Sequence, residues 1–346
     1  MRHSQRQRPF AAGICGFLLT ALLVLLSGCA TFSSSPPISA VPAQYDVAPN
    51  ASAITLQTHN HLTLFGQWWQ PRDGTAPKAV ILLVHGTYVH SGFYADWAEH
   101  LTEHGYAVLG FDMRGWGQSQ GQGRRGFVQN FDEYLEDLRL AWRQVRERYP
   151  ATPVFLQGES LGGLVSVLSQ ERGFLPVDGM ILNAPAIRPA LEVGSLRSPN
   201  WLASATLWTL SLPGEVSPNM PVLVPGSVSE MFAGMAVDSD ALVDAFKNDR
   251  HVVHTALPLG FITALEEGCT QAQDNMRNVT VPLLILQGTE DMLVPLSSSE
   301  FVMENVGSQD KTLKIYSGMS HATLHDTGHE NVWGDIVTWL DARVAK

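Results

Sequence analysis

The apolar positions of this chain fall into short continuous runs that alternate with segments of helical periodicity. Runs that are apolar at almost every position are typical of strands covered on both faces, and they occupy residues 79–85, 106–112, 153–158, 179–185 and 281–288. A weaker run at 311–318 predicts an edge strand. Between Phe131 and Tyr149 the apolar residues share one face of a helix, which Asn130 can cap, and a second amphipathic pattern runs from Asn331 to Val344. This alternation predicts the α/β class, with a mostly parallel central sheet flanked by helices.

Two regions depart from this regular alternation. Apolar and polar residues alternate over 53–69, which predicts an antiparallel hairpin with one solvent-exposed face. Residues 188–278 lack clear strand patterns and are rich in Pro, Met, Trp and Leu. We interpret this segment as a cap, or lid, inserted between two parts of the core domain at 51–187 and 279–346.

The N-terminus has the pattern of a targeting segment. Three arginines, Arg2, Arg6 and Arg8, precede an apolar run from Phe10 to Leu26, and small residues then lead to Cys29. This pattern resembles a bacterial lipobox and predicts a signal peptide at 1–28, with Cys29 lipidated and residues 29–50 as a tether. Because Ala follows Cys29 rather than Asp, the resemblance implies a lipid anchor in the outer membrane, facing the periplasm. The alternatives are an uncleaved anchor, for which a run of 17 residues is at the lower limit, and export as a soluble protein.

Composition excludes several classes of protein. Hydrophobic residues make up 45% of the chain and charged residues 16%, which excludes intrinsic disorder. The net charge of −11 and the lack of a basic cluster argue against nucleic-acid binding. After removal of the signal peptide and lipidation of Cys29, only Cys269 is left, so no internal disulfide is expected.

A G-x-S-x-G motif at 158–162 supplies the first candidate for chemistry. It follows a predicted strand and precedes a helical run, which is the context of a sharp turn that exposes a nucleophilic serine at the end of the sheet. Ser160 is therefore the candidate nucleophile. Glycines on both sides fit such a turn because backbone approaches backbone closely there.

A serine nucleophile needs a base, and the base needs a carboxylate that orients it. Asp291 lies just after the predicted strand 281–288, and His321 lies just after 311–318, so the chain order is Ser, Asp, His. The alternatives for the acid and the base are Glu290, His325 and His329. His321 is favoured because it is nearest to its strand end.

The oxyanion of an acyl-transfer intermediate needs two backbone N–H donors. We expect one from Leu161, which follows the nucleophile, and one from Thr87, in the loop after the strand 79–85. His85 and Gly86 are expected to shape that loop, and His85 as the base is a less favoured alternative.

Metal and nucleotide sites are not expected. A spacing of four would place His321, His325 and His329 on one face of a helix, where they could bind a metal. Gly328 and the pair 326–327 disfavour a helix there, and no H-E-x-x-H motif occurs. A G-x-G-x-x-G match at 121–126 lies well after a strand instead of directly at its end, so we interpret it as a loop and expect no cofactor.

Five ordered blocks that contain these residues resemble the monoacylglycerol lipase and lysophospholipase branch of the α/β-hydrolase superfamily. They are HGTYVHSGFYADWAEHL, FDMRGWGQSQGQGRRGFV, GESLGG, LQGTEDMLVP and YSGMSHATLHD. The resemblance implies an α/β-hydrolase fold, Ser160 as nucleophile, Asp291 as orienting acid, His321 as base, a cap over the pocket and no cofactor. The cap departs from the family pattern, since 188–275 is long and rich in proline.

We therefore expect a serine ester hydrolase that acts on a monoacylglycerol- or lysophospholipid-like acyl ester through an acyl-enzyme. Apolar cap residues either line an acyl tunnel or bury the cap against the core: Trp201, Leu202, Leu207, Trp208, Leu210, Leu212, Met220, Met231, Phe232 and Met235. One alternative is an aminopeptidase, which would bind the substrate amine through an acid of the cap, for which Glu215, Glu230, Asp238 and Asp240 are candidates. The other is a non-catalytic surface lipoprotein. The expected partners are the lipid-like substrate and, through the N-terminal anchor, a membrane; the sequence does not fix the oligomeric state.

Overall fold

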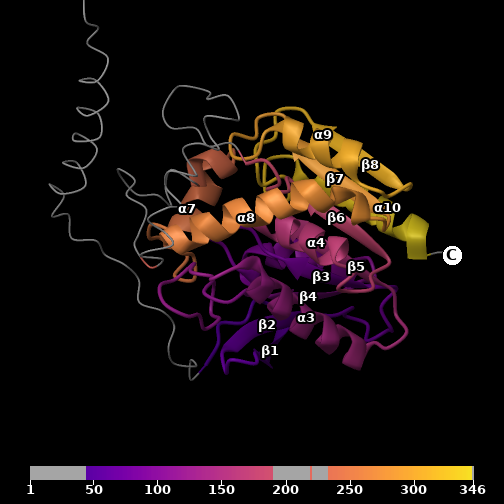
Figure 1. Cartoon of the computed structure of the whole chain (residues 1–346). Coiled ribbons are helices and arrows are strands. Elements are labelled where there is room, and N and C mark those ends of the chain that lie inside the picture. Colours follow the sequence, from indigo (N-terminus) through magenta and orange to yellow (C-terminus); the bar gives the residue numbers. More distant parts are fainter. Residues whose placement is uncertain (1–43, 190–218, 220–232, 345–346) are drawn as a thin grey trace, which may run out of the picture. The chain divides into compact units, whose positions relative to one another are not determined.

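The computed structural model describes residues 44–189, 219 and 233–344, and this part of the chain contains an eight-stranded sheet (Figure 1). The strand order is β1-β2-β4-β3-β5-β6-β7-β8. The strands are β1 (Ala51–Gln57), β2 (Thr63–Trp69), β3 (Val80–Val84), β4 (Ala107–Phe111), β5 (Val154–Glu159), β6 (Gly179–Asn183), β7 (Leu283–Gly288) and β8 (Lys311–Tyr316).

The sheet is mostly parallel, as the sequence predicted. β2 pairs antiparallel with β1 and with β4, whereas all pairings from β4 through β3 to β8 are parallel. Every residue of β3, β4, β5, β6 and β7 is buried, which explains their continuous apolar runs. β8 is partly exposed and lies at the edge, where its weaker pattern placed it.

The predicted hairpin is present, but only β1 has the expected solvent-exposed residues. All seven residues of β2 are buried. Residues from other parts of the chain cover its two faces: the ring of Tyr45 stacks on that of Phe65, and Tyr149 packs against Trp68. The loop after β4 pairs with its edge, because the backbone N–H groups of Asp112 and Gln120 donate to the carbonyls of Phe65 and Thr63. Cover from residues distant in sequence does not alter the alternation within the strand itself.

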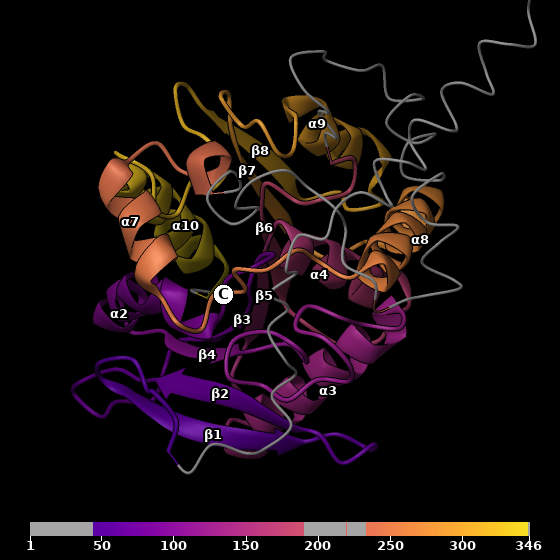
Figure 2. The same cartoon turned by 90° about the vertical axis from the view of Figure 1, so that its left-hand side faces the viewer.

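Helices cover both faces of the sheet (Figure 2). α3, α4, α8 and α9 lie on one face, and α2 and α10 lie on the other. Asn130 caps α3 as predicted, because its side chain accepts the backbone N–H of Asp132 at 3.1 Å. The helices of the two faces are α2 (Ala95–Glu103), α3 (Phe131–Arg148), α4 (Leu161–Glu171), α8 (Leu259–Asn275), α9 (Leu296–Asn305) and α10 (His329–Val344), and the short helices are η1 (Ser91–Tyr94) and η2 (Met276–Asn278).

The predicted cap segment, 188–278, is described only in part. It contains α7 (Asp240–Asn248) and also α8, which packs against α3 and α4. Residues 190–218 and 220–232 lie outside the described residues, as do residues 1–43, which carry the predicted signal peptide, Cys29 and most of the tether. Within the described ranges, no helix combines the length and the apolar character that crossing a bilayer requires.

Candidate active site

Ser160 lies in a strained turn between β5 and α4, at the carboxyl end of the sheet. Its backbone has φ 51° and ψ −112°, in the left-handed region that residues with a side chain rarely adopt. A Cβ at Gly158 would lie 2.3 Å from the carbonyl oxygen of Gly162, and one at Gly162 would lie 2.1 Å from that of Val84. Both glycines are therefore required by close approach of the backbone, and the predicted strand, sharp turn and helix are all present.

Asp291 and His321 meet in the structure although thirty positions separate them in the chain. His321 Nδ1 lies 2.8 Å from Asp291 Oδ2, and both side chains are almost completely buried. The other oxygen, Oδ1, accepts the backbone N–H groups of Leu293 and Val294 at 2.9 and 2.8 Å. Because a carboxylate only accepts, Nδ1 carries the proton, and Nε2 of the neutral ring has a free lone pair.

His321 and Ser160 line the same cavity. His321 Nε2 is buried and has no hydrogen-bond partner, so the hydrogen bond to the Ser160 hydroxyl is not formed in this structure. Burial lowers the pKa of His321, but the Asp291 carboxylate, and then Glu159 and Asp326, outweigh it, and the pKa is raised above its ordinary value. The structure thus brings together the acid and the imidazole, and it leaves Nε2 of this cavity-lining residue without a partner.

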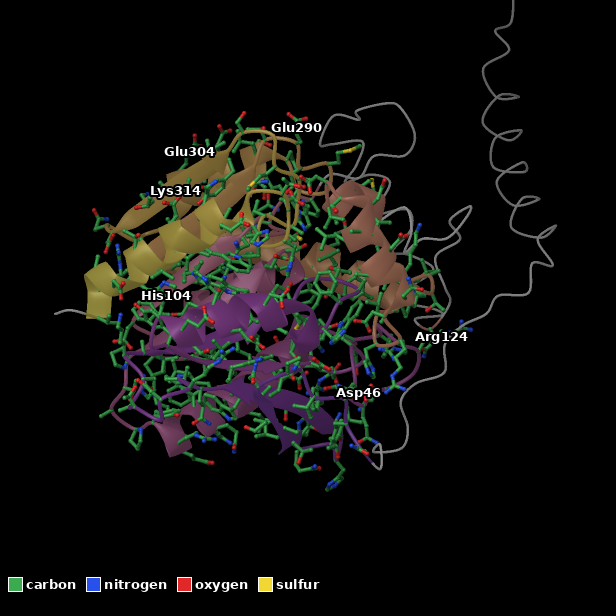
Figure 3. The ribbon with its side chains drawn as sticks, turned by 180° about the vertical axis from the view of Figure 1, so that it is seen from behind. Asp46, His104, Arg124, Glu290, Glu304 and Lys314 are labelled. Carbon is green, nitrogen blue, oxygen red and sulfur yellow. The ribbon has the colours of Figure 1, made fainter. Side chains whose placement is uncertain are left out.

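The alternative acid and bases lie elsewhere. Glu290 is exposed and points away from the molecule (Figure 3). His325 packs its ring 4.8 Å from that of Phe93, and burial lowers its pKa to about 3. His329 is the first residue of α10 and lies with Nδ1 2.9 Å from the carbonyl oxygen of Asp326. Neither His325 nor His329 hydrogen-bonds to Asp291.

The two expected oxyanion donors flank Ser160 as their sequence positions suggest. Leu161 begins α4, Thr87 lines the cavity, and neither backbone N–H donates to another group in the described part of the chain. His85 instead shapes the turn, because its Nε2 accepts the backbone N–H of Met113 and its Nδ1–H donates to the carbonyl of Gly86. His85 therefore has no free nitrogen with which to act as a base.

The loop that carries His321 is tied to the segment before α7. The backbone N–H of Ser320 donates to Asp326 Oδ2 at 2.6 Å, and the hydroxyl of Ser320 lies 3.1 Å from the carbonyl oxygen of Ala236. The backbone N–H of Ala322 donates to that same carbonyl. These bonds fix the loop on both sides of the imidazole, and none of them was predicted, because the sequence gives no signal that these segments meet.

The wall of the cavity is mostly apolar. Val89 and Phe93 come from the segment after β3, and Leu242 and Phe246 come from α7. Of the four acids considered for an amine site, Asp238 and Asp240 are exposed and do not line the cavity, while Glu215 and Glu230 lie outside the described residues. Within the described ranges, the one acidic side chain that lines the cavity is Glu159.

Comparison with known proteins places this chain in a family. A family model described as "serine aminopeptidase, S33" matches residues 75–328. The chain belongs to the S33 family of α/β-hydrolases.

Individual S33 relatives are lipases by name. A monoglyceride lipase of Rattus norvegicus is 32% identical over 285 residues, which cover 82% of this chain and 88% of the rat protein. A monoacylglycerol lipase of Mycolicibacterium smegmatis is 29% identical over 273 residues, which cover 79% of this chain and 90% of that protein. The crystal structure of the monoacylglycerol lipase of Paleococcus ferrophilus has a TM-score of 0.67 at 24% identity, covering 81% of this chain and 99% of that one. The predicted α/β-hydrolase fold is confirmed, and this S33 protein is a lipase-like serine hydrolase.

Two further sequence matches of this S33 protein lie in loops. The G-x-G-x-x-G match at 121–126 lies in a loop, and α3 begins only at Phe131. The segment from His321 to Gly328 is not helical, so its histidines do not line up on one helix face despite their spacing of four. Among the described residues, no group of three or more His, Cys, Asp or Glu side chains could hold a metal ion.

Proposed function

We propose that this protein hydrolyses a lipid-like acyl ester, of the monoacylglycerol or lysophospholipid type, through Ser160, His321 and Asp291. The observation that carries the proposal is the buried Asp291–His321 hydrogen bond of 2.8 Å, whose imidazole lines the cavity that also contains the strained Ser160. A buried imidazole that is hydrogen-bonded to a carboxylate through one nitrogen and has its other nitrogen unpartnered is what a serine nucleophile needs as its base. The apolar wall of the cavity supports an acyl chain as the group bound there.

The mechanism follows from these groups. His321 Nε2 takes the proton of the Ser160 hydroxyl as its oxygen attacks the ester carbonyl carbon. The backbone N–H groups of Thr87 and Leu161 stabilise the oxyanion. The imidazolium then protonates the departing alcohol, leaving an acyl-enzyme. A water molecule, deprotonated by the same His321, attacks the acyl-enzyme carbonyl. The imidazolium then returns the proton to the Ser160 oxygen as its bond to the acyl group breaks, which releases the fatty acid and restores the free enzyme.

Asp291 holds the imidazole in the productive tautomer and stabilises its positive charge. The hydroxyl of Ser160 has to turn toward Nε2 before the first step. Catalytic hydrogen bonds are frequently long in free enzymes and tighten when substrate binds, so an open Nε2 is compatible with this role.

A substrate panel tests the proposal. The whole chain is assayed with a monoacylglycerol, a lysophosphatidylcholine and an aminoacyl-naphthylamide, and labelling with a fluorophosphonate probe reports whether the serine is activated. We expect labelling, and a kcat/KM at least about 100-fold higher for an acyl ester than for the amide, because the described cavity has no exposed acid for an amine.

Each contrary result would support a different function for this protein. Turnover of the naphthylamide without turnover of either ester would establish an aminopeptidase, the activity that the family description names. Failure of the folded protein to label would establish a non-catalytic lipoprotein on the same scaffold.

We also propose that the mature protein is lipidated at Cys29 and anchored in the bacterial cell envelope. The support is the sequence of residues 1–30 alone. Replacing Cys29 with serine is expected to abolish incorporation of labelled palmitate and to change the apparent mass, because the acceptor thiol is lost. Cys15→Ser, within the apolar run, is the matched control and should incorporate label normally; label retained in Cys29→Ser would contradict the proposal.

A further inference from the structure

Glu159 is a buried acid that the mechanism above does not use. It ends β5, immediately before Ser160, and only 5% of its surface is exposed. The hydroxyl of Tyr94 donates to Oε1 at 2.9 Å, and this hydroxyl in turn accepts the backbone N–H of Gly86. The other oxygen, Oε2, is buried without any partner. A carboxyl group placed so close to the nucleophile at this desolvation cost calls for a function.

The location of Glu159 connects it with His321. Both residues line the cavity, and each has one polar atom without a partner: Oε2 in Glu159 and Nε2 in His321. Asp291 already occupies Nδ1 of the same ring. The charge of Glu159 therefore reaches the imidazole through the low-dielectric interior without a hydrogen bond, in addition to Asp291, which is bonded to the ring, and Asp326.

We propose that Glu159 is a positioning residue of the triad, whose negative charge stabilises the imidazolium form of His321 as Ser160 is deprotonated. The inference rests on the proposed function. Asp291 fixes the tautomer of the ring, and Glu159 adds a charge that favours the protonated ring but makes no contact with substrate. In the active form of the enzyme the ring is neutral and becomes an imidazolium only as Ser160 is deprotonated, so such a charge stabilises the transition state more than this active ground state.

The electrostatics of the site agree with this role. Burial raises the pKa of Glu159 to about 7, while His321 and the Tyr94 hydrogen bond act in the opposite direction. Glu159 in turn is one of the groups that raise the pKa of His321. The protonation of each group therefore affects the pKa of the other.

The charged and titratable groups that face this pair come from several elements. Tyr94 belongs to η1, Asp291 follows β7, and Asp326 lies in the loop after β8. Asp291 and Asp326 both raise the pKa of Glu159, and Asp326 also raises that of His321. Neither carboxylate is changed by the substitution proposed next.

The test is the pH profile of Glu159→Gln, measured on the whole chain between pH 5 and 9. The readouts are the rate constant of labelling by a fluorophosphonate and kcat/KM for a short acyl ester. Only the neutral imidazole is active, and loss of the Glu159 charge makes it bind a proton less readily. We therefore expect the midpoint of the acidic limb to fall by about half to one pH unit, and the plateau above it to fall about three- to tenfold. A general loss of structure would lower the plateau and would not move the midpoint.

Glu171→Gln is the matched control. Glu171 ends α4, is also buried with an unpartnered oxygen, and has its pKa raised to about 8 by burial, but it does not line the cavity. Its substitution should leave the midpoint unchanged. A shift of the same size in this variant would overturn the proposal, because any buried carboxyl would then produce it.

An unchanged midpoint in a labelled Glu159→Gln protein would also overturn the proposal. If that variant does not fold, Tyr94→Phe is measured in its place. This substitution removes the hydroxyl that donates to Glu159 and favours its charged form, so the midpoint of the acidic limb should fall by a smaller amount than in Glu159→Gln. No fall would refute the role of Glu159. Absence of labelling in the wild-type protein at every pH would instead overturn the proposed function, and this inference with it.

Discussion

Replacement of Ser160 with alanine is expected to lower kcat/KM for an acyl ester by at least about 10⁴-fold. Alanine removes the oxygen that attacks the carbonyl, so no acyl-enzyme can form. The residual rate would come from the cavity and the oxyanion donors alone. The turn itself should survive, because alanine keeps the Cβ that the backbone at φ 51° already accommodates. The measurement is kcat/KM together with fluorophosphonate labelling, which should disappear.

Ser297→Ala is the control for this substitution. Ser297 lies in α9 and is exposed, so the same chemical change there should leave both readouts within about twofold of the wild-type values. Retention of esterase activity in a folded Ser160→Ala protein would show that another residue is the nucleophile, and the proposed mechanism would fail.

Replacement of Asp291 with asparagine is expected to lower kcat/KM by about 10³- to 10⁴-fold with little change in the fold. The two backbone N–H groups that reach Oδ1 require an oxygen there, so the new amide nitrogen takes the place of Oδ2. It then donates toward His321 Nδ1, which must become the acceptor. The ring proton moves to Nε2, the nitrogen that has to accept the proton of Ser160. The loss arises from the wrong tautomer of an otherwise correctly placed ring.

The measurement is kcat/KM and kcat on the same acyl ester, with the melting temperature as a check on folding. Glu290→Gln is the matched control, because Glu290 is the adjacent acid and is exposed. It should retain wild-type activity. If Glu290→Gln loses activity and Asp291→Asn does not, the orienting acid has been assigned to the wrong neighbour.

The order of strands and helices could be predicted from local sequence. A strand covered on both faces must be apolar at every position, and β3 to β7 have this pattern because each is buried throughout. The hairpin shows the limit of such reasoning. β2 alternates in sequence and yet is wholly buried, because residues distant in the chain, Tyr45 and Tyr149 among them, cover its two faces.

The candidate site was predictable to the extent that it depends on the ends of strands. Ser160, Asp291 and His321 each follow a strand, and the carboxyl ends of parallel strands share one edge of the sheet, so their proximity follows from topology. The G-x-S-x-G motif adds the turn, whose glycines are fixed by close backbone approach at Gly158 and Gly162. These are local or topological properties.

What the sequence alone determined is therefore the alternation of elements, the nucleophile turn and the edge of the sheet at which the acid and the base lie. Only the tertiary structure decided which groups hold that machinery. Tyr94 of η1 donates to Glu159 at the end of β5, and the carbonyl of Ala236, before α7, accepts the backbone N–H of Ala322 in the loop after β8. The two partners of each pair lie on different elements, far apart in the chain. Buried polar groups must find partners wherever packing brings them, and a hydrogen bond between distant residues leaves no periodicity in the chain. Hydrophobic patterning indicates which face of an element is buried, but it does not indicate which polar atoms form hydrogen bonds there.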